Sequence, residues 1–600
     1  MPRLLGKRLL PLALALMLLV PGSFGQDATP PPPQKKQPLC DQERGLALVE
    51  EQVDEAKTLE PPAQRIPIMI RAADLLWLYR EEKARAIFTT AFDLAEKQFK
   101  EKGDEMREEK GVRMQLPDQR FVVMSAIARR DSAWAKRLAE RVADETKREA
   151  EKSAATASAA STLGPANVSD KVIGLALSLL TIDQQTAINV VRGTFRSSAS
   201  ISLPRFLFKL AETNQTAADQ LFQEAVNANA NAPIDGLLYL SVYPFPLNYA
   251  IGQPSSNTSY QAPPNFVPRP ALQQLFLNTF LSRGEAIVNS PPAPTQGRGL
   301  SEPANTYYGL LGLEPLIAQT QPNAIDRALK LKAALGGLLT GETRSNLTSR
   351  SESRNRPAKG FDQLVDDAEN EKDATRRDGA LGMVILNAPD SESDERVLDL
   401  ARKIRDLKFR GQLLDFLNFK FAQKATREGR LGEAAQFASK VEQLEERAYL
   451  SVQIAAEGLK RYKDRQRAAE ILNDAATIAL KADNTNEKAR ALLGVTHVFA
   501  SFDPQRAFEV LDDAIKTINH LTNPDFSSTN IPQRIQGPTF TRYAMLSVEG
   551  FSLENTFREL GPFDFDGAVI LAGKLEDKSL RATAIIALSV FCLEKPKAKQ

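Results

Sequence analysis

The side chains best suited to metal binding and nucleophilic catalysis are scarce in this chain. Its 600 residues include two histidines, His497 and His520, and two cysteines, Cys40 and Cys592. A zinc site needs three or four such ligands at close spacing, and a catalytic cysteine needs a neighbouring histidine. The sequence also has no Gly-x-Ser-x-Gly elbow and no Gly-x-x-x-x-Gly-Lys phosphate loop. We therefore expect no metal, no cofactor and no nucleophilic active site.

Carboxylates, by contrast, are numerous, because the chain has 75 Asp and Glu residues. One acidic run covers 390–395, and it lacks the Gly and the terminal Glu of a calcium loop. Because negative charge stabilises the first turn of a helix, this run and Asp564-Phe-Asp566-Gly567 indicate helix starts. A glycosidase, however, needs only two carboxylates that the fold brings together. An exported polysaccharide-active enzyme, with a carboxylate pair on a helical toroid or superhelix, is therefore the alternative function.

The densest group of aromatic side chains lies near the middle of the chain. Residues 233–303 hold twelve of the 36 prolines, and six of the ten tyrosines lie between 239 and 308. Tyrosine offers a flat apolar face and a hydroxyl group, which suits peptide grooves and sugar stacking. The candidate ligand or partner surface consists of Tyr243, Phe245, Tyr249, Tyr260, Tyr307 and Tyr308. The alternative is that these side chains anchor long loops to the surrounding helices.

A basic motif recurs three times in the second half. Each copy has an Ala, a Lys two residues later, an aliphatic residue next to it, and an Arg six residues further on. The copies are Ala401, Lys403, Ile404 and Arg410; Ala438, Lys440, Val441 and Arg447; and Ala572, Lys574, Leu575 and Arg581. Each lies at an expected turn between two helices, which is typical of stacked helical repeats. We expect the Arg to open a helix and to pair with a carboxylate of the preceding turn, such as Glu442, Glu446, Glu576 or Asp577. The alternative is a groove in which these cations hold an acidic ligand.

The helices around this motif resemble tetratricopeptide-like and related helical repeats. Residues 427–435, Arg-Glu-Gly-Arg-Leu-Gly-Glu-Ala-Ala, have the small residues that let two helices pack closely at a tight turn. An Arg-Ala pair recurs after 43 residues, at Arg447 and Arg490, and after 39 residues, at Arg467 and Arg506. We therefore predict an all-α solenoid of antiparallel helix pairs, with a Pro/Tyr-rich loop insertion in the middle. The resemblance implies a protein that binds another protein.

Composition and periodicity divide the rest of the chain. Helices are expected at 41–59, 64–79, 83–97, 118–129, 131–145 and 270–287. A low-complexity linker is expected at 153–164, and a mobile break at 341–360. The expected parts are a signal peptide (1–25), a Pro-rich disordered tether (26–40), an N-terminal helical-repeat array (41–232), the Pro/Tyr-rich insertion (233–310), a helix plus mobile linker (311–360), a C-terminal helical-repeat array (361–594) and a disordered tail (595–600).

The amino-terminal pattern and the charge balance limit location and partners. Residues 1–25 combine a positively charged N-terminal region, a twelve-residue apolar run and small residues before the expected cleavage site, as in a Sec-type signal peptide. This signal holds three of the 77 basic residues, which leaves 74 against 75 acidic residues and a mature net charge of about −1. Such a balance argues against a nucleic-acid binder and against electrostatic attachment to anionic lipid.

These observations predict an exported, non-enzymatic scaffold or binding protein of the bacterial periplasm or cell exterior. Its expected partner is another protein of the cell envelope, with a glycan as the alternative ligand. We expect Cys40 and Cys592 to be free or in intermolecular bonds, because an open solenoid keeps its ends apart and a disulfide needs close Cα atoms.

Overall fold

The helices of the first half follow the predicted order. The computed structural model describes residues 40–60, 62–104, 106–109, 112–155, 165–195, 200–251, 259–292, 300–355, 359–526 and 529–593. The predicted signal peptide and most of the predicted tether, linker 153–164 and tail therefore lie outside the described residues. The first thirteen α-helices are α1 (Gln42–Ala56), α2 (Pro62–Leu76), α3 (Glu81–Lys102), α4 (Gln119–Ala128), α5 (Ser132–Ala155), α6 (Pro165–Leu179), α7 (Gln184–Thr194), α8 (Leu203–Ala228), α9 (Ile234–Leu240), α10 (Pro270–Asn289), α11 (Glu302–Thr320), α12 (Ile325–Gly337) and α13 (Gly341–Asn355).

The second half is also mainly helical. Its α-helices are α14 (Phe361–Glu369), α15 (Ala374–Leu386), α16 (Asp394–Arg402), α17 (Leu407–Glu428), α18 (Leu431–Ala438), α19 (Leu444–Tyr462), α20 (Arg465–Lys481), α21 (Asn486–Ala500), α22 (Pro504–Asn519), α23 (Leu553–Leu560), α24 (Phe565–Gly573) and α25 (Lys578–Leu593). The described residues also include two short 3-10 helices: η1 (Pro322–Ala324), between α11 and α12, and η2 (Glu549–Phe551), just before α23.

Short polar side chains set many of the helix starts. A side-chain oxygen at the residue before the helix accepts a backbone N–H of the first turn, and each such cap is worth about 1 kcal/mol. This confirms the helix starts predicted from the two acidic runs, since Ser393 caps α16 and Asp564 caps α24. The capping residues include Asp41, Asp118, Asp183, Ser301, Asp373, Ser393, Asp406, Asp464, Thr485, Asp503, Ser552 and Asp564.

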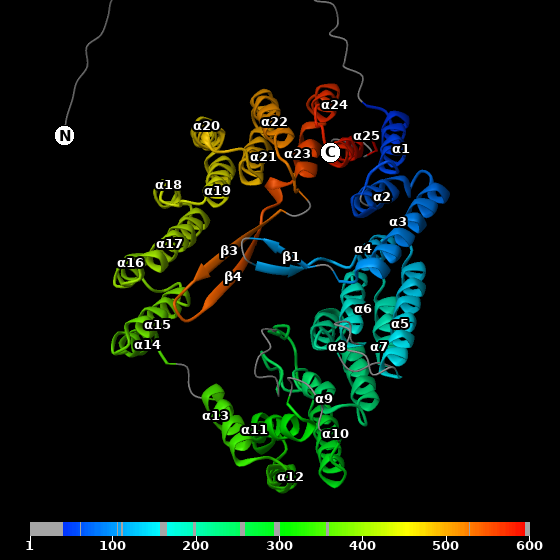
Figure 1. Ribbon diagram of the computed structural model, residues 1–600, viewed down its shortest axis with the longest axis vertical. Helices are drawn as coiled ribbons and strands as arrows, with labels where there is room; N and C mark the ends of the chain where they lie inside the picture. Colours follow the sequence, from blue (N-terminus) through cyan, green and yellow to red (C-terminus); the bar gives the residue numbers. More distant parts are fainter. Residues whose placement is uncertain are drawn as a thin grey trace, which may run out of the picture. The chain divides into compact units, whose positions relative to one another are not determined.

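The packing of these helices is that of an α-solenoid. Most helices contact their neighbour in sequence, and many also contact the next helix but one, as in the series α17, α19, α21, α23 and α25 and the series α2, α4, α6, α8 and α10. The predicted all-α solenoid is therefore confirmed. The stacking order departs from the order of the chain, because α25 packs on both α1 and α2 (Figure 1). The contacts therefore run from α14 to α25 and continue through α1 to α13.

The two ends of the helical chain are joined covalently. Cys40 and Cys592 form a disulfide across a separation of 552 residues, with their Cα atoms 5.0 Å apart. The expectation of free thiols is therefore wrong, because it assumed that a solenoid cannot bring its first and last helices together. Close packing of α1 on α25 depends on Gly45, where a Cβ atom would lie 2.7 Å from the Cβ of Cys592.

Polar contacts support the same junction. Arg44 of α1 forms an ion pair with Asp566 of α24, with the two atoms 2.5 Å apart. Arg71 of α2 pairs with Glu554 of α23 at 2.7 Å, and the Tyr79 hydroxyl donates to the carbonyl of Leu593 at 2.7 Å. The junction between the chain ends is therefore held by packing and hydrogen bonds as well as by the disulfide.

The predicted loop insertion is part of a continuous core. One hydrophobic cluster extends from Leu46 to Leu347 and includes Tyr243, Tyr260 and Tyr307. The segment 233–310 contains the predicted helix as α10, and also α9 and the start of α11, which the sequence analysis missed. The break in helical structure predicted at 341–360 is absent over most of this range, because α13 occupies Gly341–Asn355.

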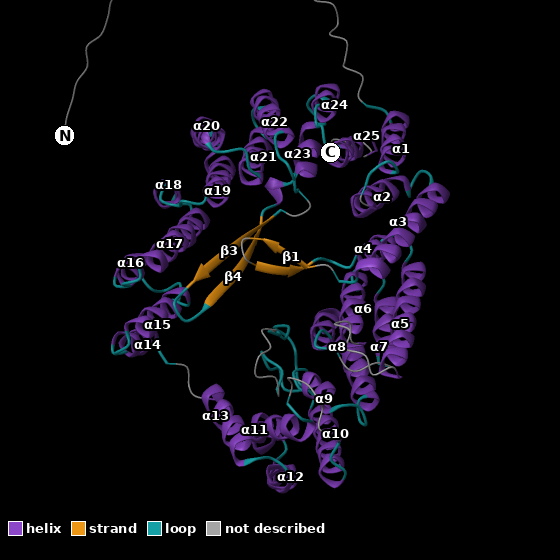
Figure 2. Ribbon diagram, in the orientation of Figure 1, coloured by secondary structure: helices purple, strands orange, loops and turns teal. Residues whose placement is uncertain are grey.

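In the part of the chain that the structure describes, two antiparallel hairpins interrupt the helices (Figure 2). The strands β1 (Met106–Glu109) and β2 (Val112–Gln115) form one, and β3 (Asn530–Gln536) and β4 (Thr541–Ser547) form the other, with Asn530 opposite Ser547 and Gln536 opposite Thr541. Neither hairpin was predicted from the sequence. The second hairpin contacts helices more than 120 residues earlier in the chain, because the Gln536 backbone N–H donates to Gln412 at 2.9 Å. It thereby ties α17 to the later repeats.

Candidate interaction surface

The structure places most of the candidate aromatic residues in the core. Tyr243, Phe245, Tyr260, Tyr307 and Tyr308 are all at most 7% exposed, and Tyr249 is 50% exposed. The Tyr260 hydroxyl donates to the carbonyl of Ile201 at 2.8 Å, across the loop that precedes α8. Buried side chains of this kind cannot contact a partner while the fold is intact. Their positions agree with the alternative that they anchor the Pro-rich loops.

The strongest of these anchors is the contact of Tyr243 with Asp219. The Tyr243 hydroxyl donates to Asp219 at 2.8 Å, and the Arg269 guanidinium lies 2.6 Å from the other carboxylate oxygen. Burial raises the pKa of Asp219 although Tyr243 and Arg269 act to lower it, and burial together with the carboxylate raises the pKa of Tyr243. The phenol therefore stays protonated and joins the Pro/Tyr-rich segment to α8 and to the residue before α10.

Replacing Tyr243 with Phe should weaken this anchor. The ring would keep its packing, but Asp219 would lose a buried hydrogen bond, so we expect the free energy of unfolding to fall by about 1–2 kcal/mol. Tyr249→Phe is the matched control, because the ring of Tyr249 is half exposed and surface changes usually alter stability by less than about 0.5 kcal/mol. Urea unfolding followed by tyrosine fluorescence measures both. Equal stabilities for the two variants would contradict the assigned role of Tyr243.

The recurrent basic motif lies at three turns of the solenoid, between α16 and α17, between α18 and α19, and between α24 and α25. In all three copies the Ala and the aliphatic residue are buried, with exposed fractions of 4% or less. In two copies the Lys reaches back to a carboxylate of an earlier helix. Lys403 pairs with Glu369 of α14 at 2.6 Å, and Lys574 pairs with Asp512 of α22 at 2.7 Å. The motif therefore joins neighbouring helix pairs.

The Arg of the motif has a different partner from the one we expected. Arg410 donates to the backbone carbonyl of Ile404 at 3.4 Å, and Arg581 donates to the carbonyl of Leu575 at 3.3 Å. The expected carboxylate of the preceding turn is therefore replaced by the carbonyl of the buried aliphatic residue, because that carbonyl faces the new helix. Arg581 has a carboxylate within 3.6 Å, but it belongs to Glu55 of α1.

Each of these turns is also held by a hydrogen-bond acceptor that was not predicted from the sequence. The backbone N–H that follows the buried aliphatic residue donates to a side-chain oxygen of an earlier helix. The three bonds are Arg405 N–H to Asp378 (2.9 Å), Glu442 N–H to Asp415 (2.7 Å) and Glu576 N–H to Asn519 (3.1 Å). The first two acceptors both precede their turns by 27 residues, and this constant spacing is the signal that could have identified them.

The middle turn departs from the other two and opens into a pocket. Lys440 lies over the ring of Phe437, 5.4 Å from its centroid, and Arg447 Nε is buried without a hydrogen-bond partner among the described residues. The neighbouring pocket has a volume of about 220 Å³. It is lined by Gln412, Asp415, Phe416, Gln443, Glu445, Glu446 and residues 531–535 of β3. We name it the strand pocket.

The electrostatics of the strand pocket are set by its carboxylates. Glu445 is committed to a buried ion pair with Arg490 at 3.1 Å, in which the side chains are 2% and 4% exposed. Burial raises the pKa of Asp415, the nearby charge of Glu442 raises it further, and the hydrogen bond from the Glu442 backbone opposes both. Both carboxylates therefore already have partners within the protein, and Arg534 also lines the pocket.

Two substitutions at Asp415 should separate the effect of its hydrogen bond on stability from the effect of its charge. Asp415→Ala leaves the Glu442 N–H without its acceptor, so we expect the free energy of unfolding to fall by about 1–2 kcal/mol. Asp415→Asn keeps an acceptor, as Asn519 does at the corresponding turn. Because the folded pKa of Asp415 is raised, ionisation costs stability as pH rises, so Asn should match or exceed wild type at pH 7. Urea unfolding at pH 7 tests both, and an Asn variant as unstable as the Ala variant would contradict the account.

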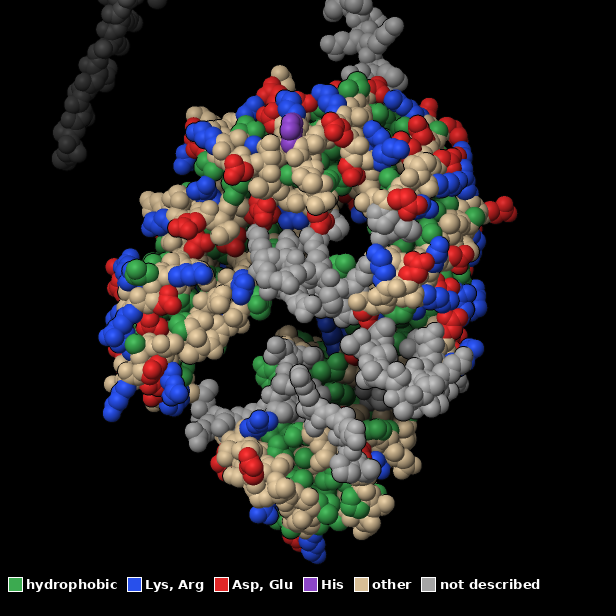
Figure 3. Space-filling model, viewed as in Figure 1, with side chains coloured by type: hydrophobic (Ala, Val, Ile, Leu, Met, Phe, Trp, Pro, Cys, Tyr) green, Lys and Arg blue, Asp and Glu red, His purple; other side chains and the backbone are tan. Residues whose placement is uncertain are grey.

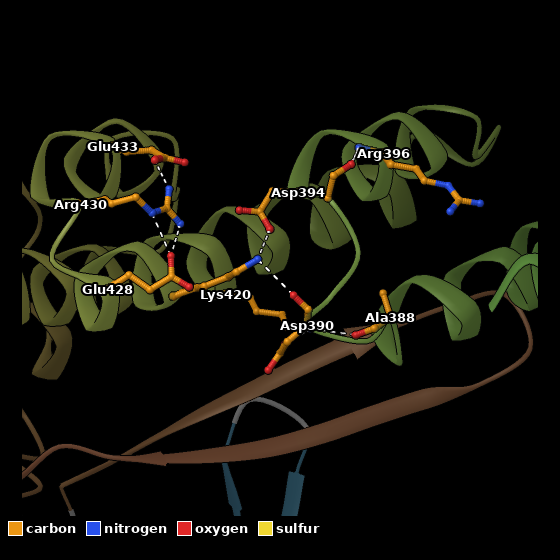
Figure 4. A network of polar contacts seen from close by, with 10 residues as sticks. Ala388, Asp390, Asp394, Arg396, Lys420, Glu428, Arg430 and Glu433 are labelled. Carbon is orange, nitrogen blue, oxygen red and sulfur yellow. Dashed lines mark hydrogen bonds and ion pairs between the residues drawn. The ribbon is translucent and has the colours of Figure 1, made fainter. Parts of the chain in front are cut away.

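Polar contacts also hold the turns near the C-terminal end of α17 (Figure 4). Lys424 of α17 pairs with Asp394 of α16 at 2.9 Å, and Lys420 donates to the carbonyl of Ala388 at 3.3 Å. Just beyond the C-terminal end of α17, Arg430 lies between Glu428 and Glu433 and contacts both. These contacts fix the α15–α16 loop and the α17–α18 turn. They are partly exposed, so their contribution is more to orientation than to stability.

The surface and composition of the described part carry few other chemical signals. Positive and negative side chains alternate over the face in Figure 3, in keeping with the balanced charge. Within the described ranges, no group of three or more His, Cys, Asp or Glu residues is arranged to hold a metal ion. No helix in the same ranges has both the length and the apolar character to cross a membrane.

One segment of the chain is similar to a known family. Residues 419–530, from within α17 to the start of β3, match the family model of SNAP, the soluble NSF attachment protein. No curated protein matches the chain. Among solved structures, the chain is similar to a "circular tandem repeat protein with novel repeat topology and enhanced subunit contact surfaces". The identity is 14%, the TM-score is 0.12, and the alignment covers 91% of this chain and 96% of the other. So low a TM-score supports no conclusion about function.

Proposed function

We propose that this protein is an exported, non-enzymatic scaffold that holds another protein on its C-terminal helix pairs. The observation that carries the proposal is the stacking of α17 to α22. These helices form consecutive antiparallel pairs, two pockets open at their junctions, and they span most of the segment that is similar to a TPR-like helical-repeat family. Helical solenoids of this kind use extended surfaces of adjoining repeats to bind their partners.

Export rests on the sequence of residues 1–25 and on the disulfide. The apolar run with its charged start is typical of a Sec-type signal, and disulfides persist in oxidising compartments such as the bacterial periplasm. We place the protein in the periplasm or outside the cell, where its partner would be another envelope protein. Fractionation of cells that make the protein tests this step: a mature chain in the cytosol with its cysteines reduced would overturn it.

The partner itself can be sought by purification. The tagged full chain is crosslinked with formaldehyde in intact cells, isolated from the envelope fraction and analysed by mass spectrometry. A matched control is an unrelated exported protein with the same tag and signal. We expect one envelope protein in near-stoichiometric amount with the chain and absent from the control. Failure to enrich any protein, together with release of oligosaccharides from envelope polysaccharide, would overturn the scaffold in favour of the enzyme.

A further inference from the structure

A second pocket lies where α18, α19 and α20 meet, and we name it the helix pocket. Its volume is about 220 Å³. It is lined by Leu431, Gly432, Ile454, Ala455, Gly458, Tyr462, Asp464, Arg467, Ala468 and Ile471. The floor is apolar, because Ile454, Ala455 and Ala468 are each at most 2% exposed. Tyr462 is 60% exposed and stands at the same pocket.

The helix pocket lies where two hydrophobic core clusters meet and their side chains do not fill the space between them. Ile454 belongs to the core cluster around α17 and α18, whereas Ala455 and Ala468 belong to the next cluster along the solenoid. The helix α18 has 8 residues and α20 has 17, so the shorter helix leaves part of the longer one uncovered. At Gly458 an added Cβ atom would meet only Leu431, at the ordinary contact distance of 3.4 Å. The space beside Gly458 can therefore hold an apolar side chain from outside.

The chain beside this pocket is strongly basic. Residues 460–467 read Lys-Arg-Tyr-Lys-Asp-Arg-Gln-Arg, with five cations and one carboxylate, and all eight are exposed. The single carboxylate, Asp464, is used as the cap of α20, where it accepts the Arg467 backbone N–H at 2.9 Å. The structure gives no ion pair to Lys460, Lys463 or Arg465 within the described residues. These three residues define the basic rim.

The turn that presents the basic rim is held in an unusual conformation. Lys463 has φ of 56°, and it is the one non-glycine residue with a positive φ among the described residues. The left-handed region costs a side-chain-bearing residue about 1 kcal/mol or more. The turn is nevertheless fixed, because the Tyr462 hydroxyl donates to the carbonyl of Gly429 at 3.1 Å and Arg461 donates to the carbonyl of Arg427 at 2.7 Å. The rim therefore keeps its place beside the pocket.

We propose that the helix pocket and the basic rim together bind an acidic amphipathic segment of a protein partner. An apolar side chain of that segment fills the space beside Gly458, and carboxylates next to it pair with Lys460, Lys463 and Arg465. An apolar anchor in a pocket supplies affinity, and complementary rim charges supply orientation and association rate. The inference rests on the proposed scaffold function and adds the site and the chemistry of its partner.

Synthetic peptides test the chemistry directly. The probe is an 18-residue peptide with Leu on one helical face and Glu on the other, labelled with fluorescein. One control peptide replaces Glu by Lys, and a second replaces Leu by Ala. Fluorescence anisotropy with the full chain should give binding of the probe at least tenfold tighter than of either control. Equal affinity for the probe and for both controls would overturn the proposal.

Two variants of the protein locate the binding. Gly458→Leu fills the pocket from within, and the triple variant Lys460→Glu, Lys463→Glu and Arg465→Glu reverses the rim. Each variant should bind the probe peptide with at least tenfold lower affinity than the wild-type protein. The matched control reverses Lys330, Lys372 and Lys408, which are also exposed and far along the sequence, and it should change affinity by less than about twofold because nothing at the site has changed. Unchanged binding in both site variants would overturn the proposed site. Circular dichroism checks that every variant is folded.

Purification of the cellular partner distinguishes failure of this proposed site from failure of the proposed scaffold function. If an envelope protein is enriched with wild type and equally with Gly458→Leu and the rim variant, the scaffold stands and the site is wrong. If the wild-type chain enriches no protein, the proposed function itself is wrong. Loss of the enriched partner with both site variants, and its retention with the Lys330, Lys372 and Lys408 control, is the expected result.

Discussion

Replacing Asp118 with Ala is expected to destabilise the packing of α3, α4 and α6 by about 3–5 kcal/mol, the usual cost of removing one member of a buried ion pair. Asp118 is the cap of α4, and its side chain is 2% exposed. Arg120 donates to it at 2.8 Å and Lys171 at 3.1 Å. The Arg120 guanidinium also lies 3.3 Å from the centroid of the Phe99 ring. Without Asp118, Lys171 would keep its ion pair with Asp104 at 2.6 Å, but the buried Arg120 would have no carboxylate partner among the described residues.

The same group should make this region sensitive to acid. Burial alone would raise the pKa of Asp118, but the hydrogen bonds and charges of Arg120 and Lys171 lower it below its ordinary value of 3.8. A carboxylate with a lowered folded pKa contributes stability above its unfolded pKa, and that stability is lost as the pH falls through the folded pKa. The Asp118 contribution should therefore be complete at pH 6 and decline below about pH 4.

Hydrogen exchange at pH 6, resolved to peptides of α3, α4 and α6, measures the Asp118 effect where it arises. Asp118→Asn is the informative control, because the amide still caps α4 but carries no charge. We expect the Ala variant to exchange fastest, Asn to be intermediate, and wild type to be slowest. If Asn and wild type exchange alike at pH 6, the buried charges do not stabilise this part of the fold.

Loss of the disulfide is the second large effect. Linking residues 552 apart removes much of the freedom of the unfolded chain, and the loop-entropy estimate for so long a loop is about 6 kcal/mol. The double variant Cys40→Ser and Cys592→Ser should unfold at a clearly lower urea concentration. In this variant, peptides of α1 and α25 should also exchange hydrogen sooner than those of α17 and α19, because the disulfide links the residue Cys40 before α1 to Cys592 in α25.

Chemical reduction of the wild-type protein provides the matched test. Reduction by a dithiol should reproduce the urea midpoint of the double Ser variant and leave that variant itself unchanged. Thiol titration of the denatured, unreduced chain should detect no free cysteine. Two free thiols in protein purified from the envelope would contradict the covalent closure.

The sequence predicted most of the helices and the repeat architecture for a physical reason. Periodic apolar positions and capping residues such as Asp406 and Asp503 are local signals, and they are sufficient to place helices and the turns between them. Residues Ala401 and Ile404 were identified as part of a junction because the motif repeats. Their burial follows from the stacking that the repeat requires.

Features that depend on distant parts of the chain were not predicted. The pairing of Cys40 with Cys592 requires α1 to reach α25, and no local pattern encodes that contact. The hairpin of β3 and β4 was missed because Pro532 lies within β3 and lacks a backbone donor, which argues against a strand in sequence alone. Gly537 begins the turn between β3 and β4, and this glycine is the sequence signal that could have indicated the hairpin.

The candidate binding residues show the same division. Aromatic density drew attention to Tyr243 and Tyr260 as a candidate partner surface, but composition cannot tell a buried anchor from an exposed contact. The strand pocket and the helix pocket arise from the junctions of α17 to α20 and from β3, and so they depend on how consecutive repeats are placed. A basic run such as 460–467 is visible in the sequence, whereas the apolar floor beside it appears only once α18, α19 and α20 are packed.

Crosslinking mass spectrometry of the native complex tests the central claim most directly. A short lysine-reactive reagent is applied to intact envelope, and the crosslinks from this chain to any other protein are assigned to residues. We predict that intermolecular crosslinks concentrate on lysines of α17 to α20, such as Lys440, Lys460 and Lys463. Crosslinks to other proteins that fall only on α1 to α13, or no reproducible intermolecular crosslink at all, would contradict a scaffold that binds through its C-terminal repeats.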